Sequence, residues 1–259
     1  MNDDFYIGYF DQSPRRIAGH TRWLVVLLAM LVAGLAVLLA ARQAPAEPGT
    51  FEFGVKRTFE GVLYESPLPL LHSVSSVGAV TNYLLVGEGK HGLPAFARGH
   101  EGERVRFQGS LIQKGIAQMI ELNDAKSFTV LGVASAQERL AASETIGEAV
   151  LIGELVDTKC YFGVMRPAVG KVHRACALRC LSGGVPPGLL VRDNQGDAIV
   201  LLLTGPGGQP LKFDVQWAAR QVEAGGKLFI NEGVTRLEVE RLSLAMDESR
   251  QVRLSLDRN

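Results

Sequence analysis

The chain has 259 residues, of which 47% are hydrophobic and 21% charged, enough for one or two globular cores of ordinary size. Its 27 basic and 27 acidic residues give a formal net charge of zero. This balance argues against the basic surface with which proteins neutralise nucleic-acid phosphates, so we expect no nucleic-acid partner.

The first predicted element is an apolar helix over residues 23–41 (WLVVLLAMLVAGLAVLLAA). At 1.5 Å per residue it is about 28 Å long, close to the hydrocarbon thickness of a bilayer. We therefore predict a single transmembrane helix, with the lipid bilayer as its partner. The alternative is a cleaved signal peptide, because residues 44–46 (APA) have the small-residue pattern of a cleavage site.

The charges beside this helix predict its orientation. Arg15, Arg16 and Arg22 lie close before the apolar run, whereas only Arg42 lies close after it. This bias favours a cytoplasmic N-terminus. We expect a single-pass protein of the cytoplasmic (inner) membrane whose C-terminal domains are extracytoplasmic, in the periplasm, where disulfides form.

Beyond residue 50 the chain repeats itself. Residues 57–64 and 147–156 both have the pattern of an opening strand with an internal glycine. Residues 102–109 match residues 226–233, with the same interval between glycines and alternating apolar positions. Two similar β-rich domains explain the repeat, and each has one more strand candidate, at residues 116–122 and 235–242.

The order of elements in the second half narrows the fold. Residues 188–193 and 197–203 flank Asn-Gln-Gly at 194–196, which suits a short hairpin turn. Residues 214–224 have the pattern of a helix that begins at an aspartate cap and ends at two glycines. Three strands, a helix and two strands is the order of a five-stranded OB-type barrel. The first half has a shorter equivalent, with residues 93–98 in the position of the helix.

The predicted fold class is mainly β with short helices: a single N-terminal transmembrane helix followed by two tandem OB-like β-barrel domains. The expected segments are a cytoplasmic tail (1–22), the transmembrane helix (23–41), a linker (42–50), the first barrel domain (51–133), a second linker (134–146), the second barrel domain (147–244) with an insertion at 160–187, and a C-terminal tail (245–259).

All three cysteines lie with one histidine in that insertion, as Cys160-x12-His173-x2-Cys176-x3-Cys180. Residues 171–181 have a helical composition, and on a helix positions i, i+3 and i+7 place His173, Cys176 and Cys180 on one face. Cys160 follows a strand and could meet that face. The pattern predicts a Cys3His metal site, with Zn as the default ion and Cu(I) as a competitor.

Charged residues near the cluster have two interpretations. Asp157 could orient His173 as a second-shell partner of the metal, but we favour reading Asp157 and Lys159 as surface charges at a strand end. Basic residues on the predicted helix could lower thiol pKa values or bind an anion. They are Lys171, Arg174 and Arg179.

The segment from Glu154 to Cys180 resembles a bacterial exported β-barrel domain with the pattern VDxxC followed by HxxCAxxC and a glycine turn. The resemblance implies that Asp157, Cys160, His173, Cys176 and Cys180 belong to one site, and it implies no particular reaction. The layout of a short tail, one span and an exported barrel is also similar to that of the haem chaperone of cytochrome c maturation, although no matching haem-attachment histidine motif is present.

The leading functional hypothesis is non-enzymatic: metal binding, or support of a membrane-associated redox complex, with a redox or metal-handling protein as partner. One alternative is a structural or interaction module in which Cys160 forms a disulfide with Cys176 or Cys180. Another is a thiol oxidoreductase. No hydrolase motif such as G-x-S-x-G or H-E-x-x-H occurs, and we predict no catalytic residues.

Overall fold

The computed structural model describes residues 15–42, 48–193 and 197–245. Most of the predicted N-terminal tail, part of the first linker, the turn at 194–196 and nearly all of the C-terminal tail lie outside these ranges. The chain divides into two compact units, residues 1–46 and 47–259, and each is described by itself.

The first unit contains helix α1 (Arg15–Arg42), which extends the predicted apolar helix at both ends. Its segment Ile17–Ala41 is long and apolar enough to cross a membrane, and by length and composition a signal sequence would pass the same test. Large apolar side chains such as Leu27 and Leu31 are well exposed along the helix.

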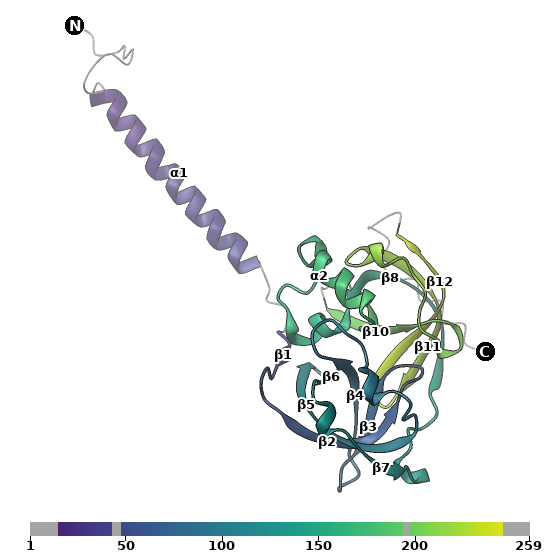
Figure 1. Ribbon diagram of the computed structural model, residues 1–259. Helices are drawn as coiled ribbons and strands as arrows, with labels where there is room; N and C mark the ends of the chain where they lie inside the picture. The colour runs from purple at the N-terminus through teal and green to yellow at the C-terminus, as the bar shows by residue number, and fades with distance from the viewer. Residues whose placement is uncertain (1–14, 43–47, 194–196, 246–259) are drawn as a thin grey trace. The chain divides into compact units, whose positions relative to one another are not determined.

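The first barrel of the second unit is a ring of five strands in the order β5, β2, β3, β4 and β6, closed by pairing between β6 and β5 (Figure 1). These strands are β2 (Arg57–Tyr64), β3 (Leu70–Val74), β4 (Val80–Gly87), β5 (Glu103–Lys114) and β6 (Ala117–Leu122). Two short strands, β1 (Thr50–Phe51) and β7 (Thr129–Val133), also pair with β5.

The second barrel is a closed ring in the order β10, β12, β11, β8 and β9. Its strands are β8 (Glu144–Asp157), β9 (Pro187–Arg192), β10 (Ala198–Thr204), β11 (Gln221–Asn231) and β12 (Val234–Leu244). In each barrel the third and fifth strands are parallel and all other ring pairs are antiparallel. This shared topology confirms two tandem five-stranded β-barrels, with the parallel pairing of third and fifth strands in each.

The strand registers correct one detail of the predicted repeat. In the first barrel Gly61 pairs with Val105, and in the second the equivalent Gly153 pairs with Val222. Four residues further along each fourth strand, Gly109 is therefore equivalent to Gly226. The sequence match had aligned residues 102–109 with 226–233, which paired the correct strands in the wrong register.

The helix predicted over residues 214–224 is wrong. Only a 3-10 turn (Val215–Trp217) forms, and β11 already begins at Gln221. The physical reason is that Val222 and Ala224 are buried while Glu223 is exposed, which is the period of a strand. The matching segment of the first barrel is likewise only a 3-10 turn, Ala95–Ala97.

Three apolar clusters hold the second unit together. One fills the first barrel around Phe107 and Leu71, and another fills the second barrel around Leu155 and Leu237. The third lies between the barrels and draws residues from both, among them Leu84, Met119, Val156, Phe162, Cys160 and Cys180. The cysteine segment is therefore part of the interface between the barrels.

A pair of adjacent glycines tests the packing of the second barrel. An added Cβ at Gly226 would lie 1.9 Å from the carbonyl oxygen of Glu238, whereas at Gly225 the nearest atom would be 3.5 Å away. We expect Gly226→Ala to lower the free energy of unfolding by about 2 kcal/mol or more, because backbone must move. Gly225→Ala is the matched control and should cost less than about 1 kcal/mol in the same urea titration. Equal stabilities would contradict this packing.

Candidate metal centre

The cysteine segment connects β8 to β9. It consists of a single π-helical turn, Cys160–Val164, and helix α2 (Gly170–Ser182). The first backbone N–H of α2, at Gly170, donates to Glu154 Oε1 over 2.5 Å. The helix ends at Ser182, and the N–H of the following residue, Gly183, donates to the carbonyl oxygens of Arg179 and Cys180. Both ends of the helix are thus fixed.

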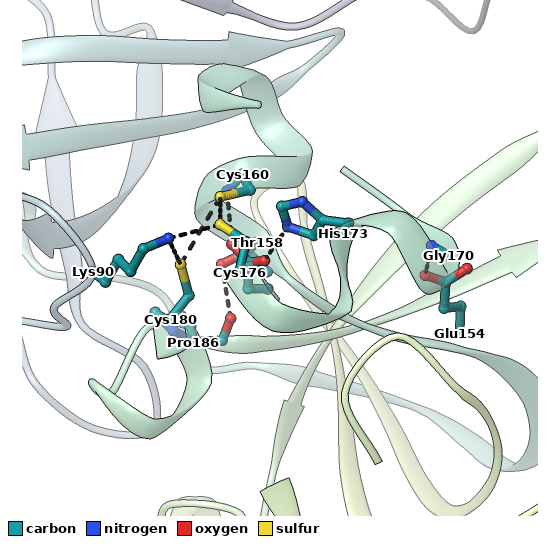
Figure 2. A network of polar contacts seen from close by, with 10 residues as sticks. Lys90, Glu154, Thr158, Cys160, Gly170, His173, Cys176, Cys180 and Pro186 are labelled. Atoms are coloured by element: carbon teal, nitrogen blue, oxygen red, sulfur yellow. Dashed lines mark hydrogen bonds and ion pairs between the residues drawn. The ribbon is translucent and has the colours of Figure 1, made fainter. Parts of the chain in front are cut away.

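The three thiols converge on one point, as Figure 2 shows. Cys160 Sγ lies 3.7 Å from Cys176 Sγ and 3.9 Å from Cys180 Sγ, and all three sulfur atoms lie within 4.8 Å of one another. The cysteines are free, with Cys160 and Cys180 buried and Cys176 partly exposed. Thiols at this separation can close around a single ion without a large backbone movement.

His173 lies in a second triad, which shares Cys160 with the thiol cluster but does not include Cys176 or Cys180. Ligand atoms of Asp157, Cys160 and His173 lie within 4.8 Å of one another, and all three residues are buried. His173 Nε2 lies 2.8 Å from Asp157 Oδ2, and the Cys160 backbone N–H donates to Asp157 Oδ1 over 2.8 Å. The carboxylate therefore holds both the imidazole and the turn that carries Cys160.

The favoured reading of Asp157 and Lys159 as surface charges is wrong. Asp157 is fully buried and Lys159 is 1% exposed. Lys159 Nζ donates to the carbonyl oxygens of Gly87 (2.7 Å) and Gly89 (2.6 Å) and forms an ion pair with Glu121 on β6. A strand end that would normally face water is covered here by the other barrel, so both charges are buried with partners.

The basic side chain beside the thiols comes from the first barrel. Lys90 follows β4, and its Nζ donates to Cys176 Sγ over 2.7 Å and lies 3.8 Å from Cys180 Sγ (Figure 2). The helix residues Lys171, Arg174 and Arg179 were the basic candidates in the sequence. Of these, Arg174 instead donates to the carbonyl oxygen of Gln216. Among the described residues, Lys90 is the basic residue that contacts the sulfur atoms.

The loop that carries Lys90 packs closely on the end of α2. Gly92 N–H donates to the Gly183 carbonyl oxygen over 2.9 Å. An added Cβ at Gly183 would lie 1.8 Å from the Lys90 carbonyl oxygen. Only glycine permits this approach, which places the Lys90 ammonium at the sulfur atoms.

The contacts within the cluster shift the pKa values of two thiols in opposite directions. The contact with Cys180, burial and the Asp157 carboxylate raise the pKa of Cys160. The contact with Cys160 and the positive charge of Lys90 lower the pKa of Cys180. The hydrogen bond to Cys176 raises the pKa of Lys90. Burial alone would raise the pKa of Asp157, yet the bonds from His173 and the Cys160 N–H bring it below its usual value.

The sequence pattern correctly predicted that the three cysteines lie together, but it gave no indication that Lys90 contacts them. That residue lies 70 positions before Cys160, in a domain without cysteines, and only the packing between the barrels brings it to the site. No family model, curated protein or solved structure matches this chain.

A double-mutant cycle tests the buried ion pair. We expect Lys159→Met to cost about 3–5 kcal/mol of stability, because it leaves the Glu121 carboxylate buried without its partner. Adding Glu121→Leu should recover about 1–3 kcal/mol relative to the sum of the single variants. The exposed Lys171→Met on α2 is the control, with an expected change within about 0.5 kcal/mol by urea denaturation. If Lys159→Met were as stable as this control, the ion pair would have no structural role.

Proposed function

We propose that this protein is a membrane-anchored, extracytoplasmic metal-binding protein whose ligands are the thiolates of Cys160, Cys176 and Cys180. The observation that carries the proposal is the convergence of three free, largely buried thiols within 4.8 Å of one another. Thiolates are soft ligands that select ions such as Zn²⁺ and Cu(I).

His173 is the candidate for a fourth ligand. Asp157 contacts its Nε2, so Nδ1 is the ring nitrogen that remains to coordinate a metal ion. A carboxylate that holds a histidine ring in this way is the usual arrangement around metal-bound histidines, where it fixes the tautomer and orientation. Three thiolates and one imidazole would complete the tetrahedron that Zn²⁺ prefers.

The charge balance favours a divalent ion. Three thiolates and the Asp157 carboxylate carry four negative charges, and the Lys90 ammonium offsets one of them. Zn²⁺ would leave one negative charge and Cu(I) would leave two. Because the site is mostly buried, the arrangement with the smaller net charge costs less desolvation energy. Lys90 therefore supports Zn²⁺ binding without acting as a ligand.

A disulfide brace is the second candidate function, and one distance favours it. Cys160 Sγ is 3.7 Å from Cys176 Sγ, so a small movement would allow a bond between the π-helical turn and α2. In an oxidising compartment such a bond would brace the insertion and leave Cys180 as a free thiol.

Metal content and thiol reactivity separate the two functions. For the full chain purified anaerobically in detergent without chelator, we expect about one Zn²⁺ per chain by elemental mass spectrometry. All three thiols should become reactive only after a chelator is added. Cys176→Ser should weaken Zn²⁺ binding by about 100-fold or more, because a ligand is lost. Val172→Ala, an exposed change on the same helix, should leave the affinity unaltered.

His173→Ala distinguishes the ions. It should weaken Zn²⁺ binding by about 10- to 100-fold, while Cu(I), which three thiolates can satisfy, should lose little affinity. A metal-free protein with one reactive thiol would contradict metal binding and support the disulfide brace. A metal-free protein with three reactive thiols would contradict both.

Membrane attachment rests on α1 and has a direct test. We expect the protein in the membrane fraction to have an intact mass that includes residues 23–41, and to stay with the membranes at alkaline pH, because its apolar helix remains in the bilayer. A soluble protein whose mass corresponds to cleavage after Ala46 would show that the helix is a signal sequence.

A further inference from the structure

In both barrels, the third and fifth strands pair over only part of their length. In the first barrel, parallel pairing between β4 and β6 begins at Leu84 and Met119. In the second, pairing between β10 and β12 begins at Leu202 and Arg236. Met119 and Arg236 occupy equivalent positions, so the third and fifth strands separate toward their N-terminal ends in both barrels.

Each separation leaves strand edges without a neighbour. Among the residues that the structure describes, 80–83 of β4 pair only with β3, and 117–118 of β6 pair only with β5. Within the described part of the chain, residues 198–201 of β10 pair only with β9, and residues 234–235 of β12 pair only with β11. Such edges present backbone N–H and C=O groups that another strand can bond.

The open edges of both barrels line one cavity of about 380 Å³. Thr81 and Gln118 come from the first barrel, and Val200 and Thr235 from the second. Phe162, two residues after Cys160, also lines it. The volume lies within the range of sites that bind ligands, and the lining mixes apolar side chains with a few polar ones.

The lining also indicates the chemistry of an occupant. Ile116 is 89% exposed and Val80 is 40% exposed, and both line the cavity. The charged side chain in the lining is Glu232, which also lies 3.4 Å from His72 Nδ1. Apolar contacts and one carboxylate favour a partner that is apolar at some positions and basic rather than acidic at others.

We propose that this cavity binds an extended peptide segment of a partner protein, which adds as a β-strand to the open edges of the two barrels. Strand addition supplies donors and acceptors at the spacing of the unpaired edges, which a compact small molecule does not. A segment of about three residues spans roughly 10 Å, and its successive side chains would point to opposite faces of the added strand. Basic residues beside this segment would pair with Glu232.

The test is selection from a phage-displayed library of random heptapeptides on the full chain in detergent. We expect enriched sequences with alternating apolar, β-branched residues and a net positive charge. The best peptide, fluorescently labelled, should bind in a fluorescence anisotropy titration. N-methylation of alternate backbone amides should weaken it by about tenfold or more, because the strand hydrogen bonds are lost.

Two variants locate the binding site. Thr81→Trp fills the cavity and should weaken binding of that peptide by about tenfold or more, whereas Thr129→Trp on the exposed strand β7 should change it by less than about twofold. The proposal is overturned if no sequence is enriched, or if the selected peptide binds Thr81→Trp as well as the unaltered chain. It is also overturned if sedimentation shows a dimer that Thr81→Trp dissociates, because a second copy would then occupy the cavity.

Discussion

The candidate site depends on the contacts of the buried Lys159 ammonium. Lys159 follows β8 of the second barrel, and its Nζ binds two carbonyl oxygens and one carboxylate of the first barrel. A buried cation is costly unless its donors are satisfied, so these contacts fix how the loop after β4 lies against α2. That placement in turn brings Lys90 to the thiols. The arrangement of the candidate metal centre is thus a consequence of the packing between the barrels.

The two barrels have the same topology but contribute different parts of the candidate site. The two rings share strand order and register, but only the second has a turn and a helix inserted between its first two strands. The first barrel has no cysteine and instead supplies Lys90, Glu121 and two carbonyl oxygens. The turn Cys160–Val164 serves both features, since Cys160 is in the thiol cluster and Phe162 lines the cavity between the barrels.

The sequence predicted what depends on local pattern. Residues 57–64, predicted as an opening strand with an internal glycine, form β2, and the composition of residues 171–181 predicted α2 nearly to its ends. The sequence prediction is wrong where pairing between distant strands determines the local structure. At residues 221–224, pairing with β8 overrides the helical composition. Burial of Asp157 and Lys159, and the contact of Lys90 with sulfur, depend on residues far apart in the chain, and a single sequence holds no record of such contacts.

The measurement that tests the central claim most directly is X-ray absorption at the zinc edge on the full chain loaded with one equivalent of Zn²⁺. Coordination by the thiol cluster predicts a shell of three sulfur atoms at about 2.3 Å together with one nitrogen at about 2.0 Å. A first shell made only of oxygen and nitrogen would show that the ion lies elsewhere, and the three cysteines would then have no part in metal binding.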